Sequence, residues 1–585
     1  MNRRVSFFLL LAFCCFALFW RLGSYGLTEP DEGRTAGIGL EFYQSGTWLI
    51  PRLYDLAQFN KPPLIYWACS LAYRIGGVNE WTARLPAALA ALGTLLLTRA
   101  MARRLYGDSA ALAATLILLT APMFFVMAHI IDPNMMLTFW ITLTMWAAIA
   151  WFQDGKKYQR WIFWIALGIA FLAKGPPAIL VTGLALAGLR WLPPRDGAHS
   201  RLLQTNEVTP ENAFVVAAHE PRSSSSLPWR SLLNVPAILV CIAIALSWFI
   251  AVATKYPELW KFFIGQEIVG RLTGGKLGRS QPPYYFIPIL LGGFLPWLPL
   301  FIASLVDAAS KFKTDARARL LICWVLLPFL MFSLTKSKLP AYILPLFPPL
   351  AMLMGAEAAR KYRFRWFRAV QILFAIIVPV LLVGALEHYG ANELPWIKGF
   401  MLIDRVWFWI LVVALIVSFF VPESESLLAV AVASVLTILC YLSCVKLVSF
   451  HDNELGAQSS PWKMCKAMKP LLQSSDRVAI FKNAPRGVNF YLQHPLSFSD
   501  KYEPQLDSDW KLLADRLYKD EDANVVYRWF DSEPRVFVIT TDRKRGGEAG
   551  TDKSPLDFLK ENCRKPVREI YRDDKYIVVC NFPQP

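Results

Sequence analysis

Acidic and basic side chains cluster just after the first apolar stretch of this chain. Asp31, Glu32 and Arg34 stand within four positions, and Lys61 follows in the run Phe59-Asn60-Lys61-Pro62-Pro63. Prolines border both groups, so the sequence predicts a loop here rather than one long helix. Charges held beside a membrane are costly, and they commonly mark functional sites. We therefore predict that the loop 23–83 carries the catalytic surface of a membrane enzyme.

This combination of residue types suits chemistry on a phosphate ester. A carboxylate acts as general base on an incoming hydroxyl, or orients an acceptor, and is worth roughly 10²–10⁴ in rate. Lysine and arginine give charge-assisted hydrogen bonds to phosphate oxygens, and arginine can hold two oxygens at once. Where the phosphate is the leaving group, preorganised cations stabilise the charge that develops on it.

The composition excludes an ordinary soluble protein. The chain has 585 residues, of which 55% are hydrophobic and 18% charged, with a mean hydropathy of +0.37. Soluble domains are about 45–50% apolar and about 25% charged. The net charge of +17 does not indicate nucleic-acid binding, because lysine and arginine lie in short loops between apolar runs and no zinc-finger spacing or glycine-rich phosphate loop accompanies them.

Repeated apolar runs predict an all-α polytopic membrane domain of about 13 transmembrane helices. A run of about 20 residues is long enough to cross a bilayer. The first run follows Arg3-Arg4 and lacks a small-residue cleavage site, so we expect a retained helix rather than a signal peptide. The candidate spans are 5–20, 84–101, 109–128, 134–152, 161–173, 177–192, 233–252, 285–305, 320–334, 340–356, 370–386, 406–421 and 427–447.

Alternating basic loops predict the orientation of these spans. With the N-terminus in the cytoplasm, almost every second loop is basic, including the long loop 193–231, as the positive-inside rule requires. The residues after 448 then lie outside, which is the periplasm if the membrane is a bacterial inner membrane. Three β-like runs between charged stretches predict a small soluble α/β domain at 449–585, after a transmembrane domain at 1–448; they are 477–481, 535–540 and 576–580.

The same topology places further polar residues on the outer face. Outer loops should be poor in lysine and arginine, so cations there indicate an anionic ligand. Each residue also has a plainer explanation: Asp31 and Glu32 suit a helix N-terminus, Asp132 is a good N-cap, and the lysines could reach to the membrane interface. We expect the set to gather in one place; beyond the first loop it comprises Asp132, Lys174, Arg271 in the loop 253–284, Lys336, Lys338 and Tyr342.

Several of these segments resemble one known family. They are similar to the aminoarabinose transferases of lipid A, members of the GT-C superfamily of polyprenyl-phosphate-dependent glycosyltransferases. The resemblance covers roughly residues 20–350. It is carried by Pro30-Asp31-Glu32-x-Arg34, Gly46-x-Trp48-Leu49-Ile50-Pro51, Lys61-Pro62-Pro63-Leu64-Ile65-Tyr66-Trp67, Asp132-Pro133, Leu172-Ala173-Lys174-Gly175, Phe294-Leu295-Pro296-Trp297 and Lys336-x-Lys338-Leu339-Pro340-x-Tyr342-Ile343-Leu344.

The resemblance implies an inverting transferase that moves a sugar from undecaprenyl phosphate to lipid A or another cell-envelope acceptor at the periplasmic face. Asp31 matches the family's catalytic carboxylate, and Asp132 matches a second acid needed for activity. The residues that match those around the lipid phosphate are Arg34, Lys61, Arg271 and Tyr342, and we add Glu32, Lys174, Lys336 and Lys338 as substrate-binding candidates.

Two departures from the family bear on metals and on the acceptor. Asn60 stands where family members have a glutamate, and Gln266-Glu267 replaces a Glu-His pair that contacts a metal in the family. We therefore expect no bound metal and no cofactor besides the lipid-linked donor. We also expect a monomer that contacts membrane lipids, and Cys563 and Cys580 could pair in an oxidising compartment.

Three other functions stay open at this point. A transporter or flippase of lipid-linked sugars would not need Asp31 as a base. A protein O-glycosyltransferase of the same superfamily would use a protein hydroxyl as acceptor. A structural envelope protein would use the outer cations only to bind lipid headgroups.

Overall fold

The computed structural model has two compact units, each described by itself. The helical unit comprises residues 1–20 and 87–444, and the mixed unit comprises residues 21–86 and 445–585. The structure describes residues 3–54, 56–59, 61–188, 229–257, 259–265, 280–360, 430–435, 437–438, 460–481, 485–499, 523–541, 554–573 and 575–583.

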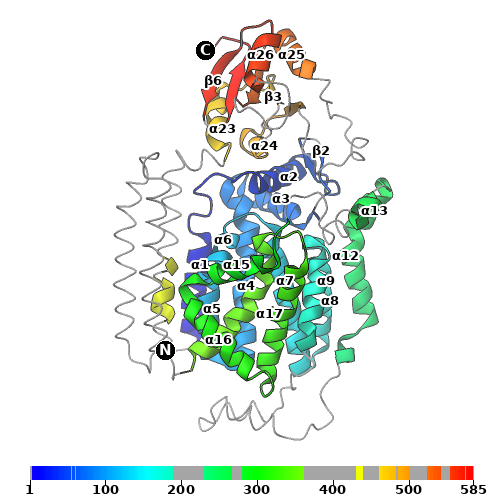
Figure 1. Cartoon of the computed structure of the whole chain (residues 1–585). Helices are drawn as coiled ribbons and strands as arrows, with labels where there is room; N and C mark the ends of the chain where they lie inside the picture. The colour runs from blue at the N-terminus through cyan, green and yellow to red at the C-terminus, as the bar shows by residue number, and fades with distance from the viewer. Residues whose placement is uncertain are drawn as a thin grey trace. The chain divides into compact units, whose positions relative to one another are not determined.

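The described part of the helical unit contains α-helices and 3-10 turns (Figure 1). Its elements are α1 (Arg3–Phe19), α4 (Glu80–Tyr106, from residue 87 on), α5 (Asp108–Thr120), α6 (Pro122–Ala128), α7 (Pro133–Asp154), α8 (Lys157–Lys174), α9 (Pro177–Leu186), η2 (Trp229–Leu232), α12 (Val235–Lys255), α13 (Leu259–Lys261), η4 (Pro283–Tyr285), α15 (Phe286–Gly293), η5 (Leu295–Trp297), α16 (Leu298–Ser310), α17 (Ala316–Leu334), η6 (Pro340–Leu346) and α18 (Phe347–Ala358).

Length and composition make this a multi-pass membrane protein. Within the described ranges, five helices are long and apolar enough to cross a membrane, or up to seven if each bent pair is one span. The predicted total of thirteen stays a prediction, because the spans 370–386 and 406–421 and most of 427–447 lie outside the described residues. The loop 193–231 lies outside them as well, except at its end.

Two predicted spans are broken rather than continuous. The run 109–128 forms α5 and α6, which meet at 67°. Pro122 starts α6 and forces Ala121 into an extended conformation, with ψ of 119°, so the helical hydrogen bonds stop there. The run 285–305 is divided between α15 and α16 at the short turn η5. Trp297 of η5 donates from Nε1 to Thr120 Oγ1 at 2.8 Å, which links the two breaks.

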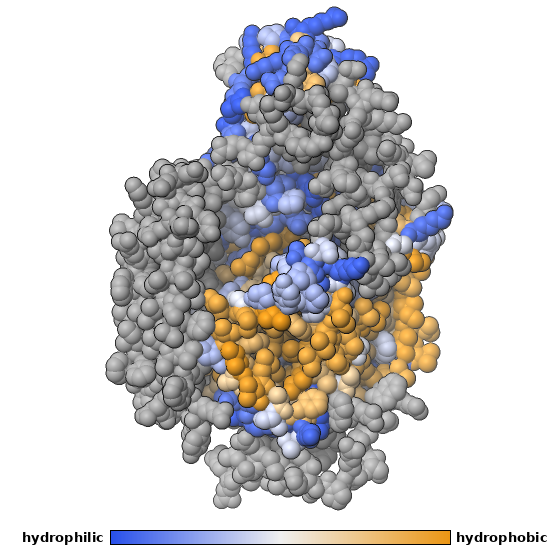
Figure 2. Space-filling view, viewed as in Figure 1, coloured by the Kyte–Doolittle hydropathy of each residue, from blue (hydrophilic) through white to orange (hydrophobic). Residues whose placement is uncertain are grey.

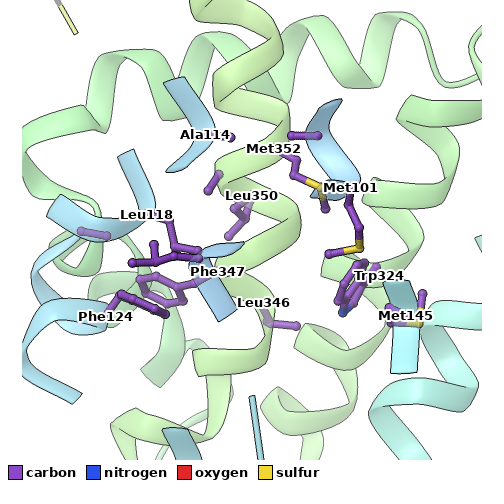
Figure 3. Close-up of a cluster of buried hydrophobic side chains, with 14 of the residues drawn as sticks. Met101, Ala114, Leu118, Phe124, Met145, Trp324, Leu346, Phe347, Leu350 and Met352 are labelled. Carbon is purple, nitrogen blue, oxygen red and sulfur yellow. The ribbon is translucent and has the colours of Figure 1, made fainter. Parts of the chain in front are cut away.

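The core of the helical unit lies where α18 packs against α5, α16 and α17 (Figure 3). Phe347, Leu350 and Met352 of α18 are fully buried there. Gly355 lets the helices approach closely, because a Cβ at this position would stand 2.5 Å from the carbonyl oxygen of Ala110. In a membrane such close packing, rather than burial from water, is the main attraction between helices.

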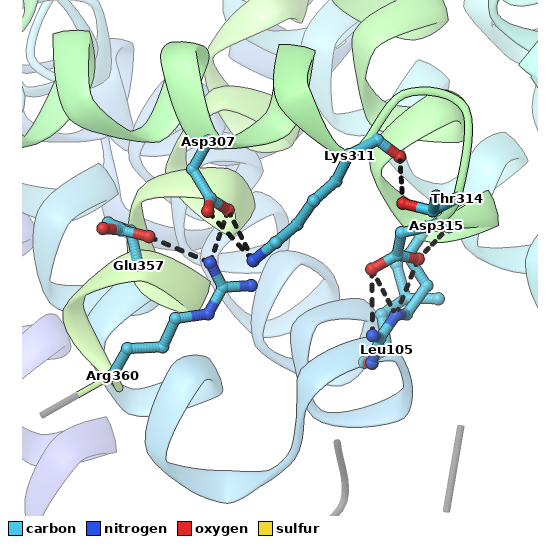
Figure 4. Close-up of polar contacts among 8 residues, drawn as sticks. Leu105, Asp307, Lys311, Thr314, Asp315, Glu357 and Arg360 are labelled. Carbon is cyan, nitrogen blue, oxygen red and sulfur yellow. Dashed lines mark hydrogen bonds and ion pairs between the residues drawn. The ribbon is translucent and has the colours of Figure 1, made fainter. Parts of the chain in front are cut away.

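One end of the same helices is held by ion pairs (Figure 4). The carboxylate of Asp307 in α16 accepts from Lys311 at 2.9 Å and from Arg360, which also pairs with Glu357 at 3.1 Å. Arg317 of α17 donates to the carbonyl of Leu105 at 3.0 Å. These cations belong to loops that the sequence predicts to be cytoplasmic. The contact of Arg360 with Asp307 connects α18 to α16, and the contact of Arg317 with Leu105 connects α17 to α4.

Exposed apolar side chains cover one face of the helical unit. In Figure 2 they form a broad orange band over helices that include α16 and α17, with hydrophilic residues beyond its lower edge. Ile302 and Val306 of α16 and Leu326, Leu330 and Leu334 of α17 are all exposed. A surface of this kind matches the apolar interior of a bilayer.

The mixed unit joins the first predicted outer loop to the C-terminal region. Its first part contains α2 (Asp31–Ser45), the strands β1 (Arg52–Leu53) and β2 (Leu56–Ala57), α3 (Leu64–Gly76) and the start of α4. Its second part contains α23 (Trp462–Met468), η8 (Lys469–Leu471), β3 (Arg477–Phe481), α24 (Val488–Leu492), β4 (Leu496–Ser499), α25 (Ala523–Ser532), β5 (Val536–Thr540), α26 (Pro555–Asn562), β6 (Arg568–Arg572) and β7 (Ile577–Cys580).

The C-terminal part is an α/β fold with a five-stranded mixed sheet in the order β4-β3-β5-β7-β6. Strand β3 is parallel to β4 and β5, whereas β7 is antiparallel to β5 and β6. The predicted strands are confirmed as β3, β5 and β7, and β4 and β6 are additional. Cys563 and Cys580 carry free thiols. The domain boundary at 448 and the location of this part outside the membrane stay predictions.

Candidate active site

The first turn of α2 carries three of the predicted site residues. Pro30 stands directly before Asp31, and Asp31 and Glu32 both lie in the first turn. Acidic side chains are stabilised there by the partial positive charge of the unpaired backbone N–H groups. The helix ends at Gly46, whose φ of 66° suits glycine. Both acids therefore lie at a helix N-terminus, as the plainer explanation expected. Their other contacts differ.

Asp31 and Arg34 form an ion pair at the surface of this helix. Arg34 Nη2 donates to Asp31 Oδ1 one turn away. The side chain of Asp31 is 55% exposed, whereas that of Arg34 is 6% exposed. Arg34 Nε is buried and has no hydrogen-bond partner in the described part of the chain. A buried guanidinium N–H without a partner is unfavourable, and Arg34 has one within the described residues.

Glu32 is engaged in a different way. Its carboxylate oxygens accept from Arg84 Nε at 3.0 Å and Nη2 at 2.9 Å, with both side chains fully buried. Oε2 also accepts from the backbone N–H and the hydroxyl of Thr28, each at 2.9 Å. These contacts favour a role in holding the loop rather than the predicted contact with substrate.

Arg84, near the start of α4, holds this loop in place and was not predicted from the sequence. Besides Glu32 it donates to the carbonyls of Leu22, Tyr25 and Gly26 at 2.9–3.1 Å, and it lies 3.8 Å from the centroid of the Tyr25 ring. All five N–H donors of its guanidinium group are thereby used. The signal was available, because an arginine at the start of the predicted span 84–101 needs a partner.

A second group of predicted residues comes together in the helical unit. Asp132 caps α7, and its Oδ1 accepts from the backbone N–H of Asn134 at 2.6 Å and from the Asn134 side chain. Lys174, the last residue of α8, donates to Asn134 Oδ1 and lies 4.3 Å from the centroid of the Tyr342 ring. Asn134 was not predicted, yet it joins Asp132 to Lys174.

The two neighbouring lysines of the loop before η6 differ in exposure. Lys338 is buried, and its amino group donates to the carbonyls of Gln281, at 2.8 Å, and Thr335. Burial lowers the pKa of Lys338. Lys336 is exposed, and its backbone carbonyl accepts from Gln281 N at 3.2 Å. The contacts of Lys338 hold the loop, whereas the side chain of Lys336 faces outward.

Lys61 and Arg271 complete the predicted set. Lys61 is partly buried between β2 and α3, and Arg271 lies outside the described residues, as does the Gln266-Glu267 pair. In the part of the chain that is described, no group of three histidine, cysteine or acidic side chains is arranged to hold a metal ion. The expectation that no metal is bound stays a prediction.

The chain is similar in sequence to several known glycosyltransferases. A family model described as dolichyl-phosphate-mannose-protein mannosyltransferase matches residues 60–196. An undecaprenyl phosphate-α-4-amino-4-deoxy-L-arabinose arabinosyl transferase 2 of Proteus mirabilis is 30% identical over 395 residues, which is 65% of this chain and 66% of that protein. The arabinosyl transferase 1 of a Pseudomonas fluorescens strain is 32% identical over 393 residues, 65% of each chain.

The predicted resemblance to the aminoarabinose transferases is confirmed. The aligned part spans just under two thirds of the length of these curated relatives. The crystal structure of ArnT from Cupriavidus metallidurans bound to undecaprenyl phosphate matches the whole chain, with a TM-score of 0.80 and 24% identity. The structure of the same protein in the apo state gives a TM-score of 0.78. The chain therefore has the fold of an aminoarabinose transferase.

Proposed function

We propose that this chain is an inverting glycosyltransferase that moves 4-amino-4-deoxy-arabinose from undecaprenyl phosphate to lipid A, at the periplasmic face of a bacterial inner membrane. The observation that carries the proposal is the pair formed by exposed Asp31 and buried Arg34, whose Nε has no partner within the described residues. It places an acid and a cation on one turn of α2. The donor and the sugar are those that the names of its relatives state for those proteins, and lipid A is the acceptor that the family resemblance implies.

The cations bind the donor phosphate in this mechanism. Arg34 offers its Nε–H to a phosphate oxygen, and Lys61 adds a point charge from the next segment of the same loop. Arg271, Lys174, Lys336 and Tyr342 are proposed as further contacts to the headgroup. As the bond between the anomeric carbon and the phosphate oxygen breaks, the phosphate takes the electron pair, and these groups stabilise its added charge.

Asp31 acts on the acceptor. An oxygen of the acceptor attacks the anomeric carbon from the side opposite the phosphate, which inverts the configuration. Where that oxygen carries a proton, Asp31 accepts it; where it does not, Asp31 orients the attacking group. The exposure of Asp31 suits this role, because an acceptor can reach its carboxylate.

Asp132 is proposed as a second acid that acts through Asn134. Its Oδ1 holds the side-chain amide of Asn134, and the amide oxygen accepts from Lys174. Lys174 is thereby directed toward the ring of Tyr342. We propose that this contact fixes the orientation of the lysine that meets the donor.

The test uses the purified full-length chain in lipid nanodiscs. Undecaprenyl phosphate-α-4-amino-4-deoxy-L-arabinose and lipid A are added, and products are identified by mass spectrometry. We expect modified lipid A and free undecaprenyl phosphate with the natural chain, and no transfer with Asp31→Asn at an unchanged unfolding temperature. Normal transfer by that variant would reject Asp31 as the carboxylate that acts on the acceptor.

Two other results would reject the proposed function itself. Glycosylation of added protein instead of lipid A would favour the protein O-glycosyltransferases, to which the match over residues 60–196 points. Movement of the donor across a bilayer without any transfer would favour a flippase.

A further inference from the structure

The segment that carries Asp31 is held by residues near the other end of the chain. Glu29, two positions before Asp31, accepts hydrogen bonds from the backbone N–H groups of Arg486 at 2.9 Å and Gly487 at 2.7 Å. Both residues lie in the turn between β3 and α24, within the same compact unit as α2. The two carboxylate oxygens each take one of these N–H groups.

Further hydrogen bonds join the two segments on either side of Glu29. The backbone N–H of Leu27 donates to the Tyr491 hydroxyl at 2.7 Å. Asn489 of α24 donates from Nδ2 to the carbonyl of Gly37 at 3.3 Å and to Glu41 at 3.2 Å. The Tyr54 hydroxyl donates to the carbonyl of Pro485. The contacts thus extend along α2 and into the loop after it.

Helix α2 lies close to α24 and to the turn before it at two glycines, and at Gly33 the neighbouring backbone leaves no room for a Cβ. A Cβ at Gly33 would stand 2.8 Å from the backbone nitrogen of Gly487, and one at Gly37 would stand 2.5 Å from Asn489 Oδ1. Real Cβ atoms essentially never approach a backbone nitrogen this closely. Gly33 and Gly37 are four residues apart and therefore lie on one face of the helix.

We infer that the C-terminal α/β fold positions the catalytic turn, through Glu29, Asn489 and Tyr491. This inference rests on the proposed function, because it assigns Asp31 the catalytic role. Glu29 is a positioning residue: it contacts the C-terminal turn, and it fixes where the chain enters α2. With that entry fixed, the carboxylate of Asp31 and the guanidinium of Arg34 hold a constant place on the helix.

Glu29→Ala tests the inference because it removes both acceptors at once. Hydrogen exchange read by mass spectrometry should show at least tenfold faster exchange at Arg486 and Gly487 and in α2. With undecaprenyl phosphate-aminoarabinose and lipid A, kcat should fall at least tenfold, while KM for either substrate changes less than threefold. Glu569→Ala is the matched control, since it breaks an exposed ion pair with Arg572 in the same unit and should change neither reading.

A second variant keeps the test decisive if Glu29→Ala does not fold. Tyr491→Phe removes only the oxygen that accepts from Leu27, and it should give the same changes to a smaller degree. Faster exchange with normal kcat in either folded variant would overturn the positioning role. Unchanged exchange would overturn the contact itself. An inactive natural chain would instead reject the proposed function, and the positioning role with it, whatever the exchange shows.

Discussion

Two arginines of the mixed unit, Arg84 in α4 and Arg34 in α2, differ in how their guanidinium donors are satisfied. Arg84 is fully buried, and each of its five donors meets an acceptor on the described chain. Arg34 is almost as buried, yet its Nε has no such partner. Their acidic partners are neighbours in the sequence, Glu32 and Asp31, but one is enclosed and the other exposed. Position in a motif therefore does not determine how a side chain is bonded, since these two arginines differ in how many of their donors are satisfied within the described residues.

The largest effect should come from separating Glu32 and Arg84. Arg84→Met leaves a buried carboxylate without its cation, and removing one partner of a buried pair typically costs about 3–5 kcal/mol. We expect the variant to lose its folded state, seen as a large fall in yield and in unfolding temperature. A folded and active variant would show that this pair does not hold the loop.

Asp31→Asn should have the next largest effect, and on activity alone. Loss of a general base is worth roughly 10²–10⁴ in rate. Because the side chain is more than half exposed, the free energy of unfolding should change by no more than about 0.5 kcal/mol, and the unfolding temperature should be nearly unchanged. Comparison with Glu32→Gln sharpens the contrast, since that variant should lose stability first. Equal losses of stability in Asp31→Asn and Glu32→Gln would contradict the different roles assigned to the two acids.

Arg34→Lys should weaken donor binding without unfolding the chain. Lysine keeps the charge but loses the fixed fork of N–H donors. A hydrogen bond to a charged group is worth about 1.5–3 kcal/mol, so we expect roughly 10–100-fold weaker binding of undecaprenyl phosphate. Tryptophan fluorescence or calorimetry in nanodiscs measures it. Unaltered affinity would mean that the Nε of Arg34 does not meet the phosphate.

The pH dependence of stability tests the contact made by Glu29, and a smaller effect is expected here. Burial raises the pKa of Glu29, although the N–H groups of Arg486 and Gly487 oppose the shift. The contribution of this group to stability is therefore complete below its ordinary pKa of about 4.3 and is lost as the pH rises through the raised value. Denaturation from pH 4 to 8 should show the natural chain losing stability relative to Glu29→Ala over that window. A constant difference would mean that the pKa of Glu29 is not raised.

The smallest effect should distinguish the two lysines before η6. Lys338→Ala leaves two carbonyls without a buried donor and should cost about 1–3 kcal/mol of stability. Lys336→Ala changes an exposed side chain, so stability should stay within about 0.5 kcal/mol. Any change in donor affinity for the second variant would then report binding directly. Equal destabilisation by Lys338→Ala and Lys336→Ala would contradict the distinction between the buried and the exposed lysine.

Local pattern was enough to predict much of the fold. Buried strands of alternating or continuous apolar residues predicted β3, β5 and β7, and apolar runs predicted the helices of the helical unit. Strands β4 and β6 were missed because both lie at sheet edges, where residues such as Leu496 and Arg568 are only partly buried or exposed. The breaks at Pro122 and near η5 were missed because an apolar run does not show where its helix bends.

Partners distant in sequence were beyond prediction from one chain. The cluster of Asp132, Lys174 and Tyr342 was expected from topology, and the structure brings these three residues together through Asn134. The pair of Glu29 with Gly487 joins residues 458 positions apart, and nothing in either segment points to the other. Glu32 illustrates the remaining difficulty, since its type and position suited a ligand contact while its actual partner is Arg84.

The separation of 457 positions between Glu29 and Arg486 has a consequence for biosynthesis. At a translation rate of about 5–20 residues per second, the glutamate leaves the ribosome roughly 20–90 s before its backbone donors exist. Until then, the turn that carries Asp31 cannot form these two hydrogen bonds in a nascent chain. Newly inserted protein thus acquires its final geometry only when synthesis is nearly complete, and a prematurely terminated chain would remain inert in the membrane.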